Sequence, residues 1–173
     1  MDATKLAKEL IDLHERPRLV PPFSARYPGL TPETGYAAAR GLHAHRVAQG
    51  WKLAGRKNGF TNRGIWERYG VNGPMWGAVY DRTLIYAQHN RATVPLAGLE
   101  QPRIEPEICF KLKSVPPLTR NPAALLEAIE WVAHSVEIVS TGTLTDAHPV
   151  KAGERWSTVL EGLSLPGLSL TFE

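Results

Sequence analysis

The sequence lacks the features that mark several common classes of protein. Its 173 residues include one cysteine, Cys109, which excludes an internal disulfide framework and gives no sign of an oxidising compartment. No run approaches the roughly 20 apolar residues that a membrane-spanning helix needs. The opening residues include Asp2 and lack the apolar run of a signal peptide. We therefore expect a cytoplasmic protein with no membrane partner.

The sequence also lacks an excess of charge of one sign. Its 20 Lys and Arg residues stand against 17 Asp and Glu residues, a formal net charge of +3. The basic residues are dispersed, with small groups at Arg16 and Arg18 and at Arg56, Lys57 and Arg63. Such groups are typical of a solvated surface or of one anionic ligand site, so we expect no nucleic acid partner.

The composition that remains is that of an ordinary soluble domain, with 43% hydrophobic and 21% charged residues. A chain of this length buries roughly two thirds of its unfolded surface and folds without a structural metal. We find no internal repeat and no low-complexity linker. The pattern favours a single domain over residues 1–173, mainly helical over 1–70 and mainly of strands over 71–173, with one helix at about 122–134.

Capping residues and hydrophobic spacing locate the helices. The spacing of Leu6, Leu10 and Leu13 predicts an amphipathic helix over residues 2–15, capped by Asp2. Thr31 caps a second helix that ends at Gly50. The patterns also predict a short helix over 61–68 and a helix from Asn121 to about His134 with a buried stripe of Leu125, Ile129 and Val132.

Strands are predicted from runs of apolar and alternating residues. They cover residues 51–57, 75–86, 103–113, 135–139, 141–145, 156–159 and 168–172, and the second of these ranges contains a turn at Asp81-Arg82.

Two glutamates of one predicted strand are the sharpest chemical signal. Residues 103–113 alternate, so Glu105 and Glu107 share one face with Cα atoms roughly 6.6–7 Å apart, and both can reach one cation. An exposed strand face also carries such pairs without function. Pro106 between them removes a ladder donor and marks an edge or a bulge.

A third glutamate, Glu137, lies in the otherwise apolar segment 136–139. Buried there, its carboxylate must be paired, protonated or bound to metal, whereas on a surface strand it would face water. With Glu105 and Glu107 it would form a hard oxygen site suited to Mg²⁺ or Mn²⁺.

One lysine and three histidines are the remaining candidates for chemistry. Lys57 lies in a glycine-rich segment that allows close approach of a ligand, and a lysine so placed can transfer protons, although an ordinary solvated lysine is the alternative. His89, His134 and His148 have no metal-ligand spacing, so we interpret each as structural.

The motifs as a set resemble the hydratase/decarboxylase family, which includes 2-keto-4-pentenoate hydratase and 4-oxalocrotonate decarboxylase, within the fumarylacetoacetate hydrolase superfamily. They follow the same order as in that family. The segments that carry the resemblance are Gly55-Arg56-Lys57, Gly59-Phe60-Thr61-Asn62, Tyr69-Gly70-Val71 with Pro74 and Trp76-Gly77, Arg103-Ile104-Glu105-Pro106-Glu107-Ile108, Glu130-Trp131-Val132-Ala133 with Glu137-Ile138-Val139, and Thr141-Gly142-Thr143-Leu144-Thr145-Asp146.

The resemblance implies an α+β fold in which N-terminal helices pack on a mixed β-roll. It also implies a Mg²⁺ or Mn²⁺ site on Glu105, Glu107 and Glu137, a catalytic Lys57, and substrate contacts from Arg56 and Thr143. In such enzymes a 2-oxo acid chelates the metal through its carboxylate and keto oxygens. One local departure is Asn58, which stands where the family usually has an apolar residue.

The roll implied by the resemblance is shortened. Family members carry several further strands between the strand of Glu137 and the Thr141-Gly142-Thr143 segment, and Glu137 aligns with either side of this gap. Ile138 and Val139 would then lie at an open sheet edge. A partner subunit could pair with this edge, the sheet could be rearranged, or the protein could have lost its activity. We expect a homo-oligomer with an interface over residues 136–145, or assembly with a related decarboxylase or hydratase subunit.

Three functions follow from these observations. The leading hypothesis is a metal-dependent lyase that hydrates 2-hydroxypenta-2,4-dienoate or decarboxylates 4-oxalocrotonate through a metal-stabilised enolate. The alternative is a non-catalytic, shortened subunit that assembles with a full-length hydratase or decarboxylase. Hydrolysis of a C–C bond in a 1,3-diketone would need a base such as histidine near the metal, and no motif marks one.

Overall fold

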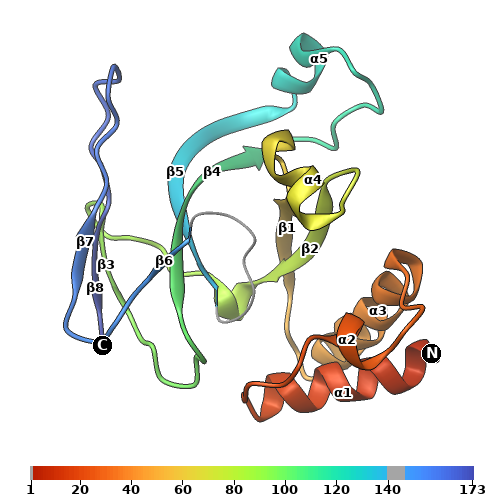
Figure 1. Cartoon of the computed structure of the whole chain (residues 1–173). Coiled ribbons are helices and arrows are strands. Elements are labelled where there is room, and N and C mark those ends of the chain that lie inside the picture. Colours follow the sequence, from red (N-terminus) through yellow and green to blue (C-terminus); the bar gives the residue numbers. More distant parts are fainter. Residues whose placement is uncertain (1, 140–146) are drawn as a thin grey trace. The chain divides into compact units, whose positions relative to one another are not determined.

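A computed structural model describes residues 2–139 and 147–173, which form two compact units. The first unit comprises Met1–Ile85 with Gly98–Glu100, and the second comprises Tyr86–Ala97 with Gln101–Glu173. Both units contain helices and strands (Figure 1). The mixed α and β class expected from the sequence is therefore confirmed. In the described ranges, no helix is both long enough and apolar enough to span a membrane.

The two long helices of the first unit begin where the sequence predicts, and a short helix between them was not predicted. They are α1 (Ala3–Glu15), the short α2 (Phe23–Arg26) and α3 (Pro32–Ala48). The side chain of Asp2 accepts a hydrogen bond from the backbone N–H of Thr4, and that of Thr31 accepts one from Thr34, so both long helices are capped as expected. The two helices pack together around Leu6, Ala7 and Ala38.

The contact between α1 and α3 leaves no room for a side chain at Gly41. A Cβ at this position would lie 2.7 Å from the Cβ of Ala7. We expect Gly41→Ala to lower the free energy of unfolding by about 1–3 kcal/mol, because the added methyl group forces packed helices apart. Gly35→Ala in the same helix is the control, since its Cβ would meet nothing within 4 Å, and it should stabilise by up to about 1 kcal/mol. Urea unfolding measures both, and equal effects would contradict this account of the helix contact.

A two-stranded sheet completes the first unit. Strand β1 (Leu53–Gly59) pairs antiparallel with β2 (Met75–Tyr80). Between them lie a 3-10 turn, η1 (Arg63–Ile65), and α4 (Trp66–Tyr69), which confirms the predicted short helix. Gly70 ends α4 with φ of 61°, a conformation that favours glycine. A second 3-10 turn, η2 (Asp81–Thr83), follows β2 at the predicted turn.

The second unit contains two three-stranded sheets. One has the order β3 (Arg91–Val94), β8 (Ser169–Phe172), β7 (Arg155–Ser157). The other has the order β5 (Ile129–Val139), β4 (Arg103–Leu112), β6 (His148–Pro149), in which β4 and β5 form a long curved pair (Figure 1). The core of this unit contains the buried side chains of Val94, Ile104, Val150, Leu170 and Phe172.

The prediction of a helix over about 122–134 is correct only for its first residues and wrong for the rest. The side chain of Asn121 caps α5 as expected, but α5 covers only Pro122–Leu126, and β5 begins at Ile129. Residues 129–139 pair with β4 along its whole length. They include β-branched and aromatic residues that suit a strand, and the ladder with β4 outweighs the local helical spacing of Leu125, Ile129 and Val132.

In the described residues β5 is an edge strand of its sheet, in keeping with the open edge expected around residues 136–145, but its side chains are partly covered. Val136 and Ile138 are half-buried and pack against the core of the second unit. Ile138 is therefore only partly exposed, because its side chain packs against the core although β5 lies at the edge of its sheet. The strand predicted over 141–145 lies outside the described residues, and the homo-oligomer stays a prediction.

Candidate functional site

Three glutamates meet on one face of the β4–β5 pair. Glu105 and Glu107 are two residues apart on β4 and therefore point to the same side. Glu137 of β5 lies directly opposite Glu105 in the antiparallel register. One carboxylate oxygen from each of the three residues can be chosen so that all lie within 4.8 Å of one another. The structure thus brings together the three residues proposed as metal ligands.

The burial and the charge of this cluster favour a bound cation. The side chain of Glu105 is buried, with 7% of the residue exposed, and Glu107 and Glu137 are half-buried. Carboxylates directly opposite each other on neighbouring strands repel, and removing a carboxylate from water is costly. A divalent cation among the three oxygens would offset both costs.

The donor set suits a hard divalent cation. Mg²⁺ binds carboxylate oxygens at about 2.1 Å and Ca²⁺ at about 2.3–2.6 Å, so two ligands of one ion lie at most about 4–5 Å apart. The 4.8 Å limit on the three oxygens is close to this span, so only small side-chain adjustments would be needed. Three carboxylates leave further positions for water or substrate oxygens. The site therefore fits a hard divalent cation.

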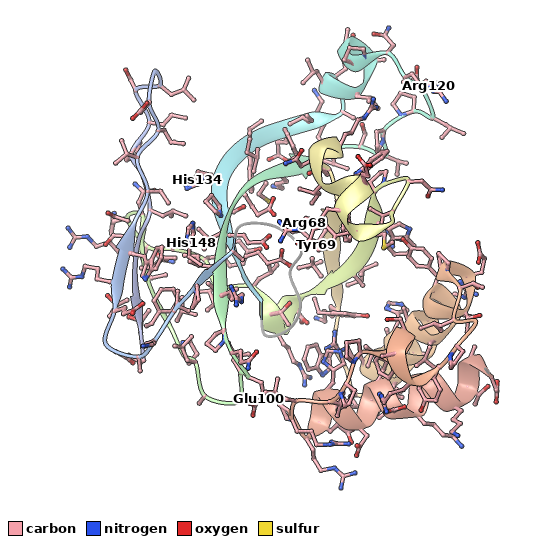
Figure 2. The ribbon with its side chains drawn as sticks, viewed as in Figure 1. Arg68, Tyr69, Glu100, Arg120, His134 and His148 are labelled. Atoms are coloured by element: carbon pink, nitrogen blue, oxygen red, sulfur yellow. The ribbon has the colours of Figure 1, made fainter. Side chains whose placement is uncertain are left out.

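The cluster lies on the face of the β4–β5 pair that is turned away from the core of the second unit. Ile104 and Ile138, on the opposite face, contribute to that core. His134 also lies on that opposite face, in register with Ile108, while His148 lies on β6 with its ring 5.7 Å from that of Trp156 (Figure 2). Neither histidine joins the carboxylates on β4 and β5, consistent with structural roles.

Lys57 lies in the first unit, on β1, where its nearest neighbours on the same face of the β1–β2 sheet are glycines and Val79 and Met75 lie diagonally from it. Its cross-strand partner is Gly77, and its neighbours two residues away on β1 are Gly55 and Gly59. A Cβ at Gly55 or Gly77 would meet nothing within 4 Å. Lys57 is half-buried, and its Nζ donates a hydrogen bond to the backbone oxygen of Asn58 at 3.4 Å. A flat ligand could approach the backbone beside this ammonium group.

Arg56 points to the face of the sheet opposite that of Lys57, because successive residues of a strand alternate. Its guanidinium carbon lies 4.3 Å from the centre of the Trp76 ring, and Trp76 stacks on Tyr36. The side chains of Arg56 and Lys57 therefore leave β1 on opposite sides, and a substrate contact from Arg56 stays a prediction. Thr143, predicted to contact the substrate, lies outside the described residues. The pairing of Gly77 with Lys57 was not visible in the sequence, since it depends on the register of β1 and β2.

Comparison with known proteins identifies relatives of one kind. A 2-hydroxyhexa-2,4-dienoate hydratase of Comamonas testosteroni is 33% identical over 127 residues, covering 72% of this chain and 47% of the relative. A 4-oxalocrotonate decarboxylase of Pseudomonas sp is 33% identical over 100 residues, or 58% of this chain and 38% of the relative. The chain belongs to this hydratase/decarboxylase family. No family model matches the chain. It spans about half the length of the curated hydratases that it matches.

Solved structures show that this chain also has the fold of a 4-oxalocrotonate decarboxylase. A 4-oxalocrotonate decarboxylase from Pseudomonas putida G7, complexed with calcium and acetate, has a TM-score of 0.82 at 16% identity and covers 99% of this chain and 97% of that one. A second structure of that enzyme, complexed with magnesium and adipate, has a TM-score of 0.69 at 21% identity, and the match covers 80% of this chain and 52% of that one. The chain thus adopts a fold that is also seen in a solved chain of similar extent.

Proposed function

We propose that this protein is a divalent-metal-dependent lyase that acts on a short unsaturated 2-oxo acid. The observation that carries the proposal is the cluster of Glu105, Glu107 and Glu137, whose carboxylate oxygens lie within 4.8 Å of one another on one sheet face. The hydratase and decarboxylase names of the relatives support the reaction class. The reaction is hydration of 2-hydroxypenta-2,4-dienoate or decarboxylation of 4-oxalocrotonate.

In this proposal the side chains divide the work between metal binding and proton transfer. A Mg²⁺ or Mn²⁺ ion held by the three glutamates would polarise the 2-keto group and stabilise negative charge that develops on the substrate. Lys57 would transfer a proton at the far carbon of the substrate. The glycines next to Lys57 (Gly55, Gly59 and Gly77) would let the planar substrate approach the ammonium group closely, since these three positions carry no side chain.

The other functions considered from the sequence are less well supported. A non-catalytic subunit would not need three clustered carboxylates, and the relatives reported above are named as enzymes. Hydrolysis of a 1,3-diketone calls for a base such as histidine near the metal. On β4 and β5 the described histidine, His134, lies on the face opposite the glutamates.

The direct test of this function is turnover by the purified protein. With Mg²⁺ or Mn²⁺ present, we expect the protein to consume 2-hydroxypenta-2,4-dienoate or 4-oxalocrotonate. The loss of the dienol absorbance measures this consumption. A chelator should stop the reaction, and renewed Mg²⁺ should restore it. If the folded, metal-loaded protein consumes neither compound, the proposed lyase activity is wrong.

A further inference from the structure

The sheet of β3, β8 and β7 has a polar face that the proposed lyase reaction does not use. Arg91 of β3 lies beside Ser169 of β8, which lies beside Ser157 of β7. In the next row, the register aligns Thr93, Thr171 and Arg155 in the same way. The six side chains point to one side of the sheet, because each pair on a strand is two residues apart. Two arginines therefore occupy opposite corners of a grid whose other four positions carry hydroxyl groups.

This face is hollowed, whereas the other face of the same sheet packs in the core. A groove of about 460 Å³ is lined by Gln88, Arg91, Ala92, Thr93, Arg155, Ser169 and Thr171. Its volume lies in the range of small-molecule sites. Leu170 and Phe172, which alternate with the hydroxyl residues of β8, are buried on the far side. The core thus holds the strands that present the polar groups.

The charge of the groove is positive. Among the described residues, neither Arg91 nor Arg155 forms an ion pair with a carboxylate. The carboxylate of Glu154 accepts hydrogen bonds from the Trp156 indole and from the backbone of Lys151. Glu173 follows Thr171 on the same side of the chain but lies one row beyond the grid. Two guanidinium groups thus flank hydroxyl donors with no acidic side chain between them.

We propose that this groove binds a tetrahedral oxyanion of the phosphate type. Strands in a sheet are about 4.8 Å apart, so the two arginines on the outer strands are near enough to reach one ligand above β8. Guanidinium groups bind phosphate oxygens with paired, charge-assisted hydrogen bonds, and the hydroxyl groups of Ser169 and Thr171 can donate to the remaining oxygens. The six positions of the grid carry two positive charges and four hydroxyl groups, and none of them is acidic.

The experiment is a titration of the full chain with inorganic phosphate by calorimetry, at low salt and without divalent metal. We expect saturable binding. Arg91→Gln and Arg155→Gln should each weaken the affinity by about tenfold, because each removes one charge-assisted contact. Thr171→Val, which keeps the shape of the side chain, should weaken it by a smaller factor. A parallel titration with glycerol phosphate separates a free phosphate site, which would exclude the ester, from a site for phosphate monoesters.

The matched control is Arg120→Gln. Arg120 is an exposed arginine of the same unit, on the loop before α5 and away from the groove (Figure 2). Its substitution should leave phosphate binding unchanged. An absence of saturable binding, or equal losses in Arg120→Gln and Arg91→Gln, would overturn the proposal. Neither result bears on the lyase activity, since the titration involves neither the metal nor the 2-oxo acid.

Discussion

Replacing Glu105, Glu107 or Glu137 with glutamine should weaken the binding of Mg²⁺ and Mn²⁺ by about 100-fold or more. Each substitution removes a negative ligand and keeps its volume, and loss of even an indirect partner of a metal ligand typically costs about 10–100-fold. Calorimetric titration of the three variants measures the loss. A thermal melt gives a second reading: Mg²⁺ at about 100 times its Kd should stabilise the wild type by about 2.7 kcal/mol, and each variant should lose this gain at the same concentration.

The control for the metal experiment is Glu130→Gln. Glu130 lies on β5, as Glu137 does, but it is exposed and its carboxylate pairs with the Lys111 ammonium at 2.9 Å, outside the glutamate cluster. Its substitution should leave the metal affinity unchanged. If all four variants bind Mg²⁺ as the wild type does, Glu105, Glu107 and Glu137 are an ordinary acidic strand face.

Lys57→Ala should lower kcat by about 100-fold or more, with a smaller change in KM. A group that transfers a proton acts in the transition state, so its loss affects the chemical step more than substrate binding. Lys57→Arg should not restore turnover, because arginine does not release its proton near neutral pH. The measurement is steady-state kinetics on the 2-oxo acid that the protein consumes, with Mg²⁺ saturating.

Lys52→Ala is the matched control for Lys57. Lys52 precedes β1, its side chain is exposed, and the hydrogen bond that it makes to Asp81 uses its backbone N–H, which the substitution keeps. Its kcat should equal that of the wild type. Full turnover by Lys57→Ala would remove Lys57 from the mechanism, while equal losses in both variants would indicate a general effect of charge on this unit.

The helices could be predicted where their signals are local. Asp2 and Thr31 cap α1 and α3 through hydrogen bonds to residues two or three positions away, so the sequence alone locates these helix starts. The helix expected over 122–134 fails for the opposite reason. The spacing of Leu125, Ile129 and Val132 is local, but β4, which overrides it, is separated in sequence from the residues with which it pairs.

The candidate site likewise has features that the sequence predicts and one that depends on the pairing of distant strands. The alternation of residues 103–113 places Glu105 and Glu107 on one face, because the side-chain period of a strand is two wherever the strand lies. The position of Glu137 depends on the register between β4 and β5, and a shift of one residue would turn Glu137 to the other face. The sequence suggested Glu137 as the third ligand but did not fix its partner on β4, and only the paired strands bring it opposite Glu105.

The sequence by itself determined the capped helices, the two glutamates of β4 and the resemblance to hydratases and decarboxylases, since each depends on spacing within a short stretch of chain. Tertiary structure alone decided three further features: the place of Glu137 directly opposite Glu105, Gly77 opposite Lys57, and Arg91 beside the hydroxyl residues of β8. Each of the three needs strands that are distant in sequence to pair in one register. That register is selected by the burial of apolar side chains such as Ile104, Leu170 and Phe172, to which residues far apart in the chain contribute together.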